Sequence, residues 1–177
     1  MSVLDRWEYL SLPVFRSRYA LAAHFIPADV RLVIEVGGYK NCIGEFIQDK
    51  VVHAVDPLLQ IDPRGFPSQV LQYTIPLRDY SSTLLEKTPF ALVALGFDLV
   101  SEEELVKFIS LAKRAEVVVI ESASDHSLNQ TNVARILCLL EGEFTWIQQD
   151  FSRNHALCAG YSAFYKREMV IVTRKTA

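Results

Sequence analysis

Seven short runs rich in β-branched and other apolar residues recur along the chain. They occupy residues 31–36, 51–55, 70–75, 90–95, 116–121, 144–149 and 169–173. Several runs are continuously apolar rather than alternating, which is typical of strands that are buried on both faces of a parallel sheet. This recurrence restricts the chain to folds that are built on a large, mostly parallel sheet.

Helical patterns lie between some of these runs. Residues 101–114 begin with Ser101, and Glu104 follows three positions later, so we expect a capping box in which each side chain binds the backbone N–H of the other residue. Residues 129–141 carry one apolar stripe, and Gly142 is expected at the C′ position, where this helix stops. Strands that alternate with helices predict an α/β fold with right-handed crossovers.

A leading amphipathic helix is predicted over residues 12–28. Its inward-facing residues are Tyr19, Ala22, Ala23 and Ile26. The other end of the chain breaks the alternation, because residues 149–169 contain loop-like segments and no clear amphipathic pattern. The last two strands are therefore expected to form an antiparallel hairpin, with a helix between them as the competing interpretation.

Length and composition exclude several classes of protein. The chain has 177 residues, which fits a single domain over 1–177, with 1–30 as a leading helical region. No apolar run reaches the roughly 18 residues that a membrane helix needs. The net charge of −3 argues against a protein that binds nucleic acid mainly through the phosphate groups of the nucleic acid. Three cysteines without a CxxC pair, and an N-terminus without an apolar signal region, favour a cytoplasmic protein with no metal site.

The first strand–loop–helix segment contains the residues that most clearly indicate a ligand-binding site. Glu35 closes the first strand, Gly37 and Gly38 form a turn, and a short helix is expected to follow. Asp56 closes the second strand, where an acid can hold a ribose through its hydroxyls. Ligands of open α/β sheets bind outside the carboxyl ends of the strands, so both acids lie where a ligand is expected. The GxGxxG fingerprint of nicotinamide-binding proteins is not present.

The segment resembles motif I of class I S-adenosylmethionine-dependent methyltransferases, an acid-x-Gly-x-Gly-x-Gly turn. Glu35 and Gly37 match the motif, whereas Tyr39 and Asn41 stand where the second and third glycines belong. Asn41 tolerates a left-handed backbone, and Gly38 is expected to form the turn beside Tyr39. The resemblance implies a three-layer Rossmann-like α/β sandwich with strand order 3-2-1-4-5-7-6 and an antiparallel strand seven.

The resemblance also implies S-adenosylmethionine as the cofactor and S-adenosylhomocysteine as the product. The cofactor-binding candidates are Glu35, Gly37, Gly38, Tyr39, Asn41, Asp56 and Gly96. In this interpretation Glu35 steadies the amino-acid end of the cofactor and Asp56 holds the ribose. The alternatives are that Glu35 caps the next helix or pairs with Lys40, and that Asp56 merely caps its strand end.

No catalytic residue stands out. The candidates are Asp98, His126 and His155, which follow the fourth, fifth and sixth strands and so would lie at the carboxyl edge of the sheet. A histidine with a pKa near 6.5 suits a general base. All three are equally compatible with plain loop residues, and we interpret His24 and His53 as structural.

Two functions remain open from the sequence. The first is a methyltransferase that acts on a small-molecule acceptor, without nucleic-acid or membrane partners. The second is a non-catalytic Rossmann-like binding domain that has kept the fold and lost the chemistry, which the incomplete glycine pattern favours. A mean hydropathy of +0.17 is compatible with a partly covered surface, such as that of a homodimer.

Overall fold

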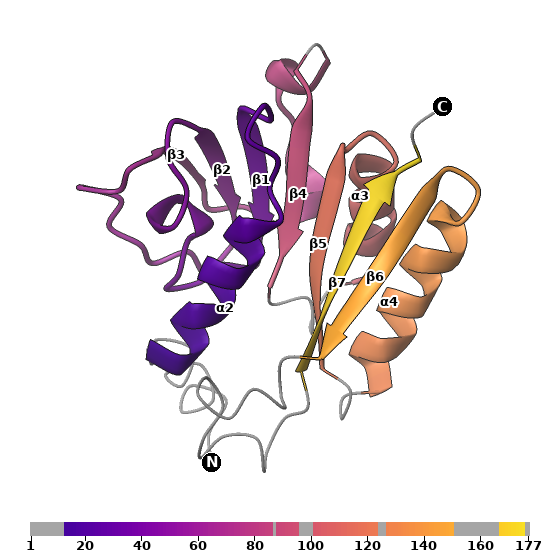
Figure 1. Cartoon of the computed structure of the whole chain (residues 1–177). Coiled ribbons are helices and arrows are strands. Elements are labelled where there is room, and N and C mark those ends of the chain that lie inside the picture. Colours follow the sequence, from indigo (N-terminus) through magenta and orange to yellow (C-terminus); the bar gives the residue numbers. More distant parts are fainter. Residues whose placement is uncertain (1–12, 87, 96–100, 124–126, 151–166, 176–177) are drawn as a thin grey trace.

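A seven-stranded sheet with the order β3-β2-β1-β4-β5-β7-β6 organises the protein (Figure 1). The computed structural model describes residues 13–86, 88–95, 101–123, 127–150 and 167–175. The strands are β1 Leu32–Val36, β2 Val51–Val55, β3 Gln69–Tyr73, β4 Phe90–Ala94, β5 Val117–Ala123, β6 Phe144–Asp150 and β7 Arg167–Arg174. All seven strands that the sequence predicts are present, and the predicted order is confirmed.

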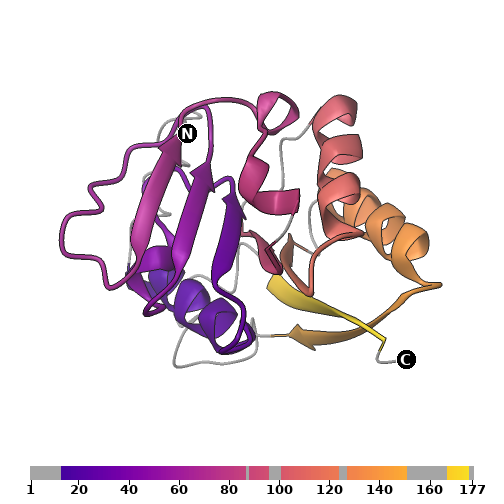
Figure 2. The same cartoon turned by 90° about the horizontal axis from the view of Figure 1, so that it is seen from above.

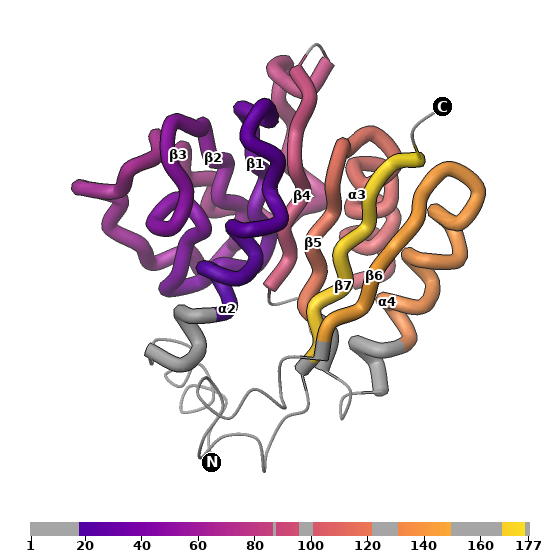
Figure 3. Tube along the Cα trace, in the orientation of Figure 1, coloured from indigo at the N-terminus to yellow at the C-terminus, as the bar shows by residue number. Residues whose placement is uncertain are grey.

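The first strand lies in the middle of the sheet. β1 pairs in parallel with β2 on one side and with β4 on the other, and Figure 3 shows its chain trace between those of these two strands. β3 and β5 extend the sheet in parallel beyond these neighbours. β7 is antiparallel to both β5 and β6, so the predicted pairing of the last two strands is confirmed.

Helices cover both faces of the sheet and give it three layers. α2, Pro13–His24, lies on one face, and α3, Glu102–Ala112, and α4, Ser127–Leu140, lie on the other (Figure 2). The α2 side buries Tyr19 and Ala22 against residues of the sheet such as Val93. The opposite side has its own core, which includes Leu92 of β4, Leu105 and Phe108 of α3, and Val133 and Ile136 of α4.

The expected capping box at the start of α3 is confirmed. The Ser101 hydroxyl accepts a hydrogen bond from the Glu104 N–H at 3.3 Å, and the Glu104 carboxylate accepts one from the Ser101 N–H at 3.1 Å. The Glu104 carboxylate also accepts the N–H of Leu77 at 3.2 Å. The cap therefore joins α3 to the segment that precedes β4.

The connections on the β1–β3 side are less helical than the sequence predicts. The short helix expected after the glycine turn is only a 3₁₀ turn, Ile43–Glu45. A Cβ on Gly44 would lie 2.7 Å from the Val70 side chain, so this turn packs directly on the sheet. Residues 56–68 contain no helix, and two further 3₁₀ turns, Leu77–Asp79 and Thr83–Glu86, lead into β4.

α4 ends two residues before Gly142, which therefore lies at the expected C′ position but without a left-handed φ. α4 begins two residues earlier than predicted and ends at Leu140. Among the described glycines, a positive φ occurs at Gly37 and Gly65 and not at Gly142. The helix instead ends in a turn over residues 141–143, in which the Glu143 N–H binds the Leu140 carbonyl at 3.1 Å.

Candidate functional site

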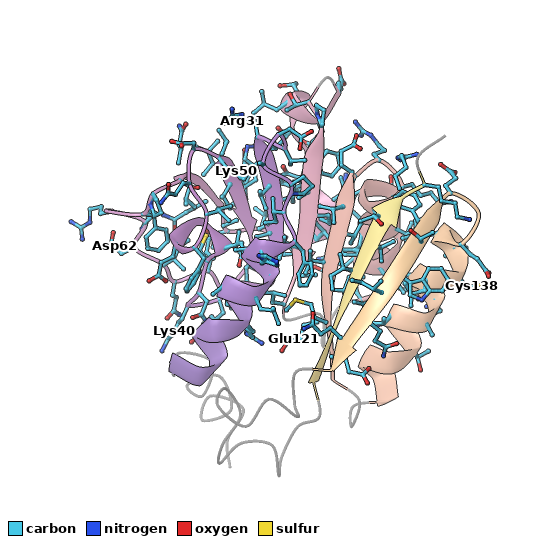
Figure 4. All side chains as sticks on the ribbon, in the orientation of Figure 1. Arg31, Lys40, Lys50, Asp62, Glu121 and Cys138 are labelled. Carbon is cyan, nitrogen blue, oxygen red and sulfur yellow. The ribbon has the colours of Figure 1, made fainter. Side chains whose placement is uncertain are left out.

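The carboxyl edge of the sheet brings the two predicted acids close together. Val36 of β1 is paired with Val55 of β2, so Glu35 and Asp56 lie on either side of this pair at the ends of neighbouring strands. In Figure 4 the same edge carries the labelled Lys40 and Glu121, and the opposite edge carries Arg31 and Lys50.

The side chain of Glu35 is almost completely buried, with 1% of its surface exposed. Its Oε2 accepts the N–H of Ile43 at 2.9 Å. The carboxylate therefore caps the 3₁₀ turn that follows β1, which is the first of the two alternatives to ligand binding given above. Its Oε1 has no hydrogen-bond partner among the described residues. Burial, the largest influence, raises the pKa of Glu35 to about 7, although the bond from Ile43 acts in the opposite direction.

Other buried polar groups surround Glu35. Tyr19 of α2 has no exposed surface, and burial is the main reason why the pKa of its hydroxyl is raised well above the usual value. Burial likewise raises the pKa of the Cys42 thiol, and the Glu35 carboxylate adds to this rise. The Tyr19 ring stacks on Phe46 with a centroid distance of 6.1 Å. These contacts make the end of β1 a buried polar cluster beneath α2.

The glycine turn differs from the prediction in a specific way. Gly37 has φ +79° and Tyr39 has φ +51°, whereas Gly38 and Asn41 do not have a positive φ. Tyr39 itself therefore adopts the left-handed conformation, and the expectation that Asn41 does so in place of a glycine is wrong. Gly38 lies in the turn and is needed there for space, because a Cβ would lie 2.6 Å from the Asn41 carbonyl oxygen and 3.1 Å from Glu35 Oε1.

Asp56 connects the turn after β1 to the end of β2. Its Oδ2 accepts the N–H of Tyr39 at 2.9 Å, and its Oδ1 accepts the N–H of Leu58 at 2.7 Å. The Tyr39 carbonyl accepts the N–H of Gln60 at 2.7 Å, and the Gly37 N–H binds the Val55 carbonyl at 3.1 Å. The predicted strand-end cap is thus observed, and it also holds the neighbouring loop.

These groups are chemically suited to hold an S-adenosyl ligand. An ionised carboxylate offers about four acceptor positions, so the Asp56 side chain keeps acceptor capacity for ribose hydroxyls beside its two backbone bonds. Asp56 is 8% exposed to solvent. Oε1 of Glu35 is a buried acceptor without a partner among the described residues, which suits a polar or cationic group. The residues present therefore fit the group that the sequence resemblance implies.

One buried ion pair at this edge was not predicted from the sequence. Arg18 of α2 forms an ion pair with Glu121 of β5, and their side chains are 3% and 2% exposed. Glu121 follows an apolar strand run, as Glu35 does, and this shared pattern is the sequence signal that could have identified it. The ion pair attaches α2 to the edge where the ligand is expected.

Several sequence-predicted candidates lie outside the described residues. They are Gly96, Asp98, His126 and His155. The other two histidines lie within the described residues: His24 is exposed, and His53 is buried in β2. The Nδ1 of His53 lies 2.6 Å from the Tyr80 hydroxyl, and burial lowers the pKa of this histidine. These two surroundings agree with the structural interpretation.

The described residues offer little support for other kinds of site. No group of three His, Cys, Asp or Glu residues there could hold a metal ion. The helices among them are too short or too polar to cross a membrane. A shallow hollow of about 390 Å³ lies at the amino edge of the sheet, lined in part by Phe90, Arg114 and Arg174. It is remote from the glycine turn.

Comparison with solved structures shows which fold this is. A TehB-like SAM-dependent methyltransferase from Corynebacterium glutamicum has a TM-score of 0.58 and 14% identity, covering 97% of this chain and 96% of that chain. The methyltransferase domain of bacterial CtHen1 has a TM-score of 0.53 and 11% identity, covering 90% and 96%. A dimethyladenosine transferase from Plasmodium falciparum also has a TM-score of 0.53 and 11% identity, covering 93% and 62%. The sequence matches no family model and no curated protein.

The chain therefore has the Rossmann-like fold of class I S-adenosylmethionine-dependent methyltransferases. The strand order and the antiparallel β7 are those that the sequence resemblance implies. Sequence identities of 11–14% to these structures support a shared fold but not a shared chemistry.

Proposed function

We propose that this protein binds S-adenosylmethionine at the carboxyl edge of β1 and β2 and transfers its methyl group to a small-molecule acceptor. The observation that carries the proposal is the pair of buried acids, Glu35 and Asp56, on either side of a turn with two left-handed residues. A bound S-adenosylmethionine would supply an electrophilic methyl group at its sulfonium.

Each group at this edge has a distinct task in the proposal. Glu35 orients the amino-acid end of the cofactor through its free Oε1. The carboxylate of Asp56 accepts hydrogen bonds from the ribose hydroxyls, and Gly38 keeps the backbone close to Glu35. α2, attached through Arg18 and Glu121, covers this end of the sheet and excludes water from it. Such positioning supplies much of the rate of a transfer between bound groups.

The acceptor is proposed to be a small molecule because of the charge balance of the chain. A net charge of −3 does not favour a nucleic-acid acceptor held through its phosphates. Catalytic roles for Asp98, His126 or His155 remain predictions. A cytoplasmic location and a homodimer also remain expectations, as does a single domain over residues 1–177.

Thermal unfolding with added ligands tests the proposal. S-adenosylmethionine or S-adenosylhomocysteine at about 100 times its Kd should stabilise the protein by about 2.7 kcal/mol. The expected result is a raised Tm with either compound and no change with NAD. A shift with NAD alone would contradict the proposal.

A non-catalytic binding domain is the second candidate, and one observation favours it. The turn between Gly37 and Asn41 is bonded to Asp56 and Gln60 by the protein's own groups. Hydrogen bonds of this kind would keep the turn folded in a protein that no longer binds a cofactor. The absence of a Tm shift with every S-adenosyl compound would support this alternative.

A further inference from the structure

Tyr39 has an unusual backbone conformation for its residue type. Its φ of +51° lies in the left-handed region, which bulky residues rarely adopt. A Cβ lowers the equilibrium constant for adopting this conformation by roughly fivefold to thirtyfold. The surrounding contacts must therefore hold the residue in place.

Two contacts fix the peptide groups on either side of the Tyr39 Cα. Its N–H donates to Asp56 Oδ2 at 2.9 Å, and its carbonyl accepts from the Gln60 N–H at 2.7 Å. Asp56 is itself held, because its Oδ1 accepts the Leu58 N–H at 2.7 Å and its carbonyl accepts the Leu59 N–H at 3.2 Å. The carboxylate is therefore a rigid acceptor that faces the Tyr39 amide.

We propose that Asp56 is a positioning residue for the cofactor loop: its carboxylate holds Tyr39 in a left-handed conformation that a glycine at this position would adopt without strain. The loop then keeps the shape of a glycine turn while it carries an aromatic side chain. That side chain is buried, and the Lys40 ammonium lies 5.5 Å from its ring centroid. The importance of this loop for cofactor binding rests on the proposed function, whereas its conformation does not.

A matched pair of variants tests the backbone conformation without any ligand. Tyr39→Gly and Tyr39→Ala both remove the ring and differ only by a Cβ at a positive φ. We expect the Gly variant to have a folding equilibrium constant about fivefold larger than that of the Ala variant in urea unfolding. Lys40→Gly and Lys40→Ala form the control, since Lys40 is exposed and has no positive φ, and there the Ala variant should be the more stable.

The role of Asp56 is tested by repeating the Tyr39 pair in an Asp56→Ala background. If the carboxylate holds the loop, an Ala at position 39 can leave the left-handed region once Asp56 is removed. The preference for Gly over Ala should then disappear or reverse. A preference that stays at about fivefold without Asp56 would overturn the proposal, because another contact would then hold the loop. If Asp56→Ala does not fold, Asp56→Ser replaces it, because the serine hydroxyl can still cap the Leu58 N–H two residues on but lacks the second oxygen that accepts the Tyr39 N–H.

Calorimetry with S-adenosylhomocysteine separates this proposal from the proposed function. Asp56→Ala should raise the Kd more in the Tyr39→Ala variant than in the Tyr39→Gly variant, because Gly adopts the bound loop conformation without help. An equal rise in both variants would show that Asp56 acts only through direct contact. Absence of binding to the wild type as well as to every variant, together with a Gly preference that depends on Asp56, would contradict the proposed function and leave the positioning role supported.

Discussion

Arg18 and Glu121 form an ion pair between α2 and the end of β5, and both side chains are nearly inaccessible to water, at 3% and 2% exposure. Taking two charges out of water is costly, and their attraction offsets this cost only while both partners are present. The pair therefore makes the attachment of α2 sensitive to the loss of either charge.

Removing one charge of this pair should be strongly destabilising. Arg18→Met is expected to lower the free energy of unfolding by about 3–5 kcal/mol, because it leaves the Glu121 carboxylate buried without this cation. The double variant Arg18→Met/Glu121→Met should recover most of that loss. Urea unfolding followed by circular dichroism measures both effects.

The surface ion pair between Glu102 and Arg135 is the control for this prediction. Their side chains are 64% and 44% exposed, and their closest N–O distance is 2.6 Å. Water and salt screen such a pair, so Arg135→Met should leave stability essentially unchanged. Equal losses for Arg18→Met and Arg135→Met would show that burial does not set the importance of the Arg18 pair.

The raised pKa of Glu35 predicts that stability falls as the pH rises. The pKa is about 7 in the folded protein, against an ordinary value of 4.5, so the folded state binds more protons than the unfolded state between these values. The free energy of unfolding should fall by about 3 kcal/mol through this range and not change further above it. Glu35→Gln should remove this slope, which urea unfolding between pH 4.5 and pH 8 can measure.

His53 contributes a change of the opposite sign, so the comparison between variants is essential. Burial lowers its pKa, and the unfolded state gains a proton as the pH falls below the ordinary value of 6.5, which lowers stability at acidic pH. This contribution is common to the wild type and Glu35→Gln. Identical pH profiles for the two proteins would contradict the assignment of the raised pKa to Glu35.

Gly38 should tolerate no side chain. A Cβ would meet the Asn41 carbonyl oxygen at 2.6 Å and Glu35 Oε1 at 3.1 Å, so Gly38→Ala must displace backbone and is expected to cost about 1–3 kcal/mol of stability. Gly142→Ala is the control, because nothing lies within 4 Å of its Cβ position and its φ is not positive. Chemical unfolding should find Gly142→Ala unchanged or slightly stabilised, and a similar loss in both variants would contradict the close approach at Gly38.

The hydrogen bond between His53 and Tyr80 should stabilise the core on the other face of the sheet. Tyr80→Phe removes the hydroxyl that lies 2.6 Å from the buried Nδ1, and we expect a loss of about 1–3 kcal/mol. Tyr73→Phe keeps a ring whose centroid lies 5.1 Å from that of His53, and it should cost less. Thermal unfolding compares the two variants, and a larger loss for Tyr73→Phe would contradict this assignment.

The sheet could be predicted from the sequence because its signal is local. The run 51–55 is the strand β2 as predicted, since four of its five residues are apolar and three of them are β-branched valines, a short pattern that favours a buried strand. The capping box of Ser101 and Glu104 was likewise predictable, since both partners lie within one turn. Each of these features depends on residues that are adjacent in the chain.

The details of the site could not be predicted because they depend on distant contacts. The left-handed φ of Tyr39 opposes its own preference and is supported by Asp56, which lies 17 positions away. The Arg18–Glu121 pair joins residues 103 positions apart, and only the packing of α2 on the sheet brings them together. The two acids at the ends of β1 and β2 were found from the sequence, but the partners of their oxygen atoms were not.

Titration calorimetry of S-adenosylhomocysteine into the wild type and Asp56→Ala tests the proposed function most directly. Charge-assisted hydrogen bonds from ribose hydroxyls to a carboxylate contribute roughly 1.5–3 kcal/mol each. The wild type should therefore bind the ligand, and Asp56→Ala should bind it at least about tenfold more weakly, since about 1.4 kcal/mol corresponds to one decade. Equal affinities would remove Asp56 from the ligand site, and no binding to the wild type would contradict the proposed function.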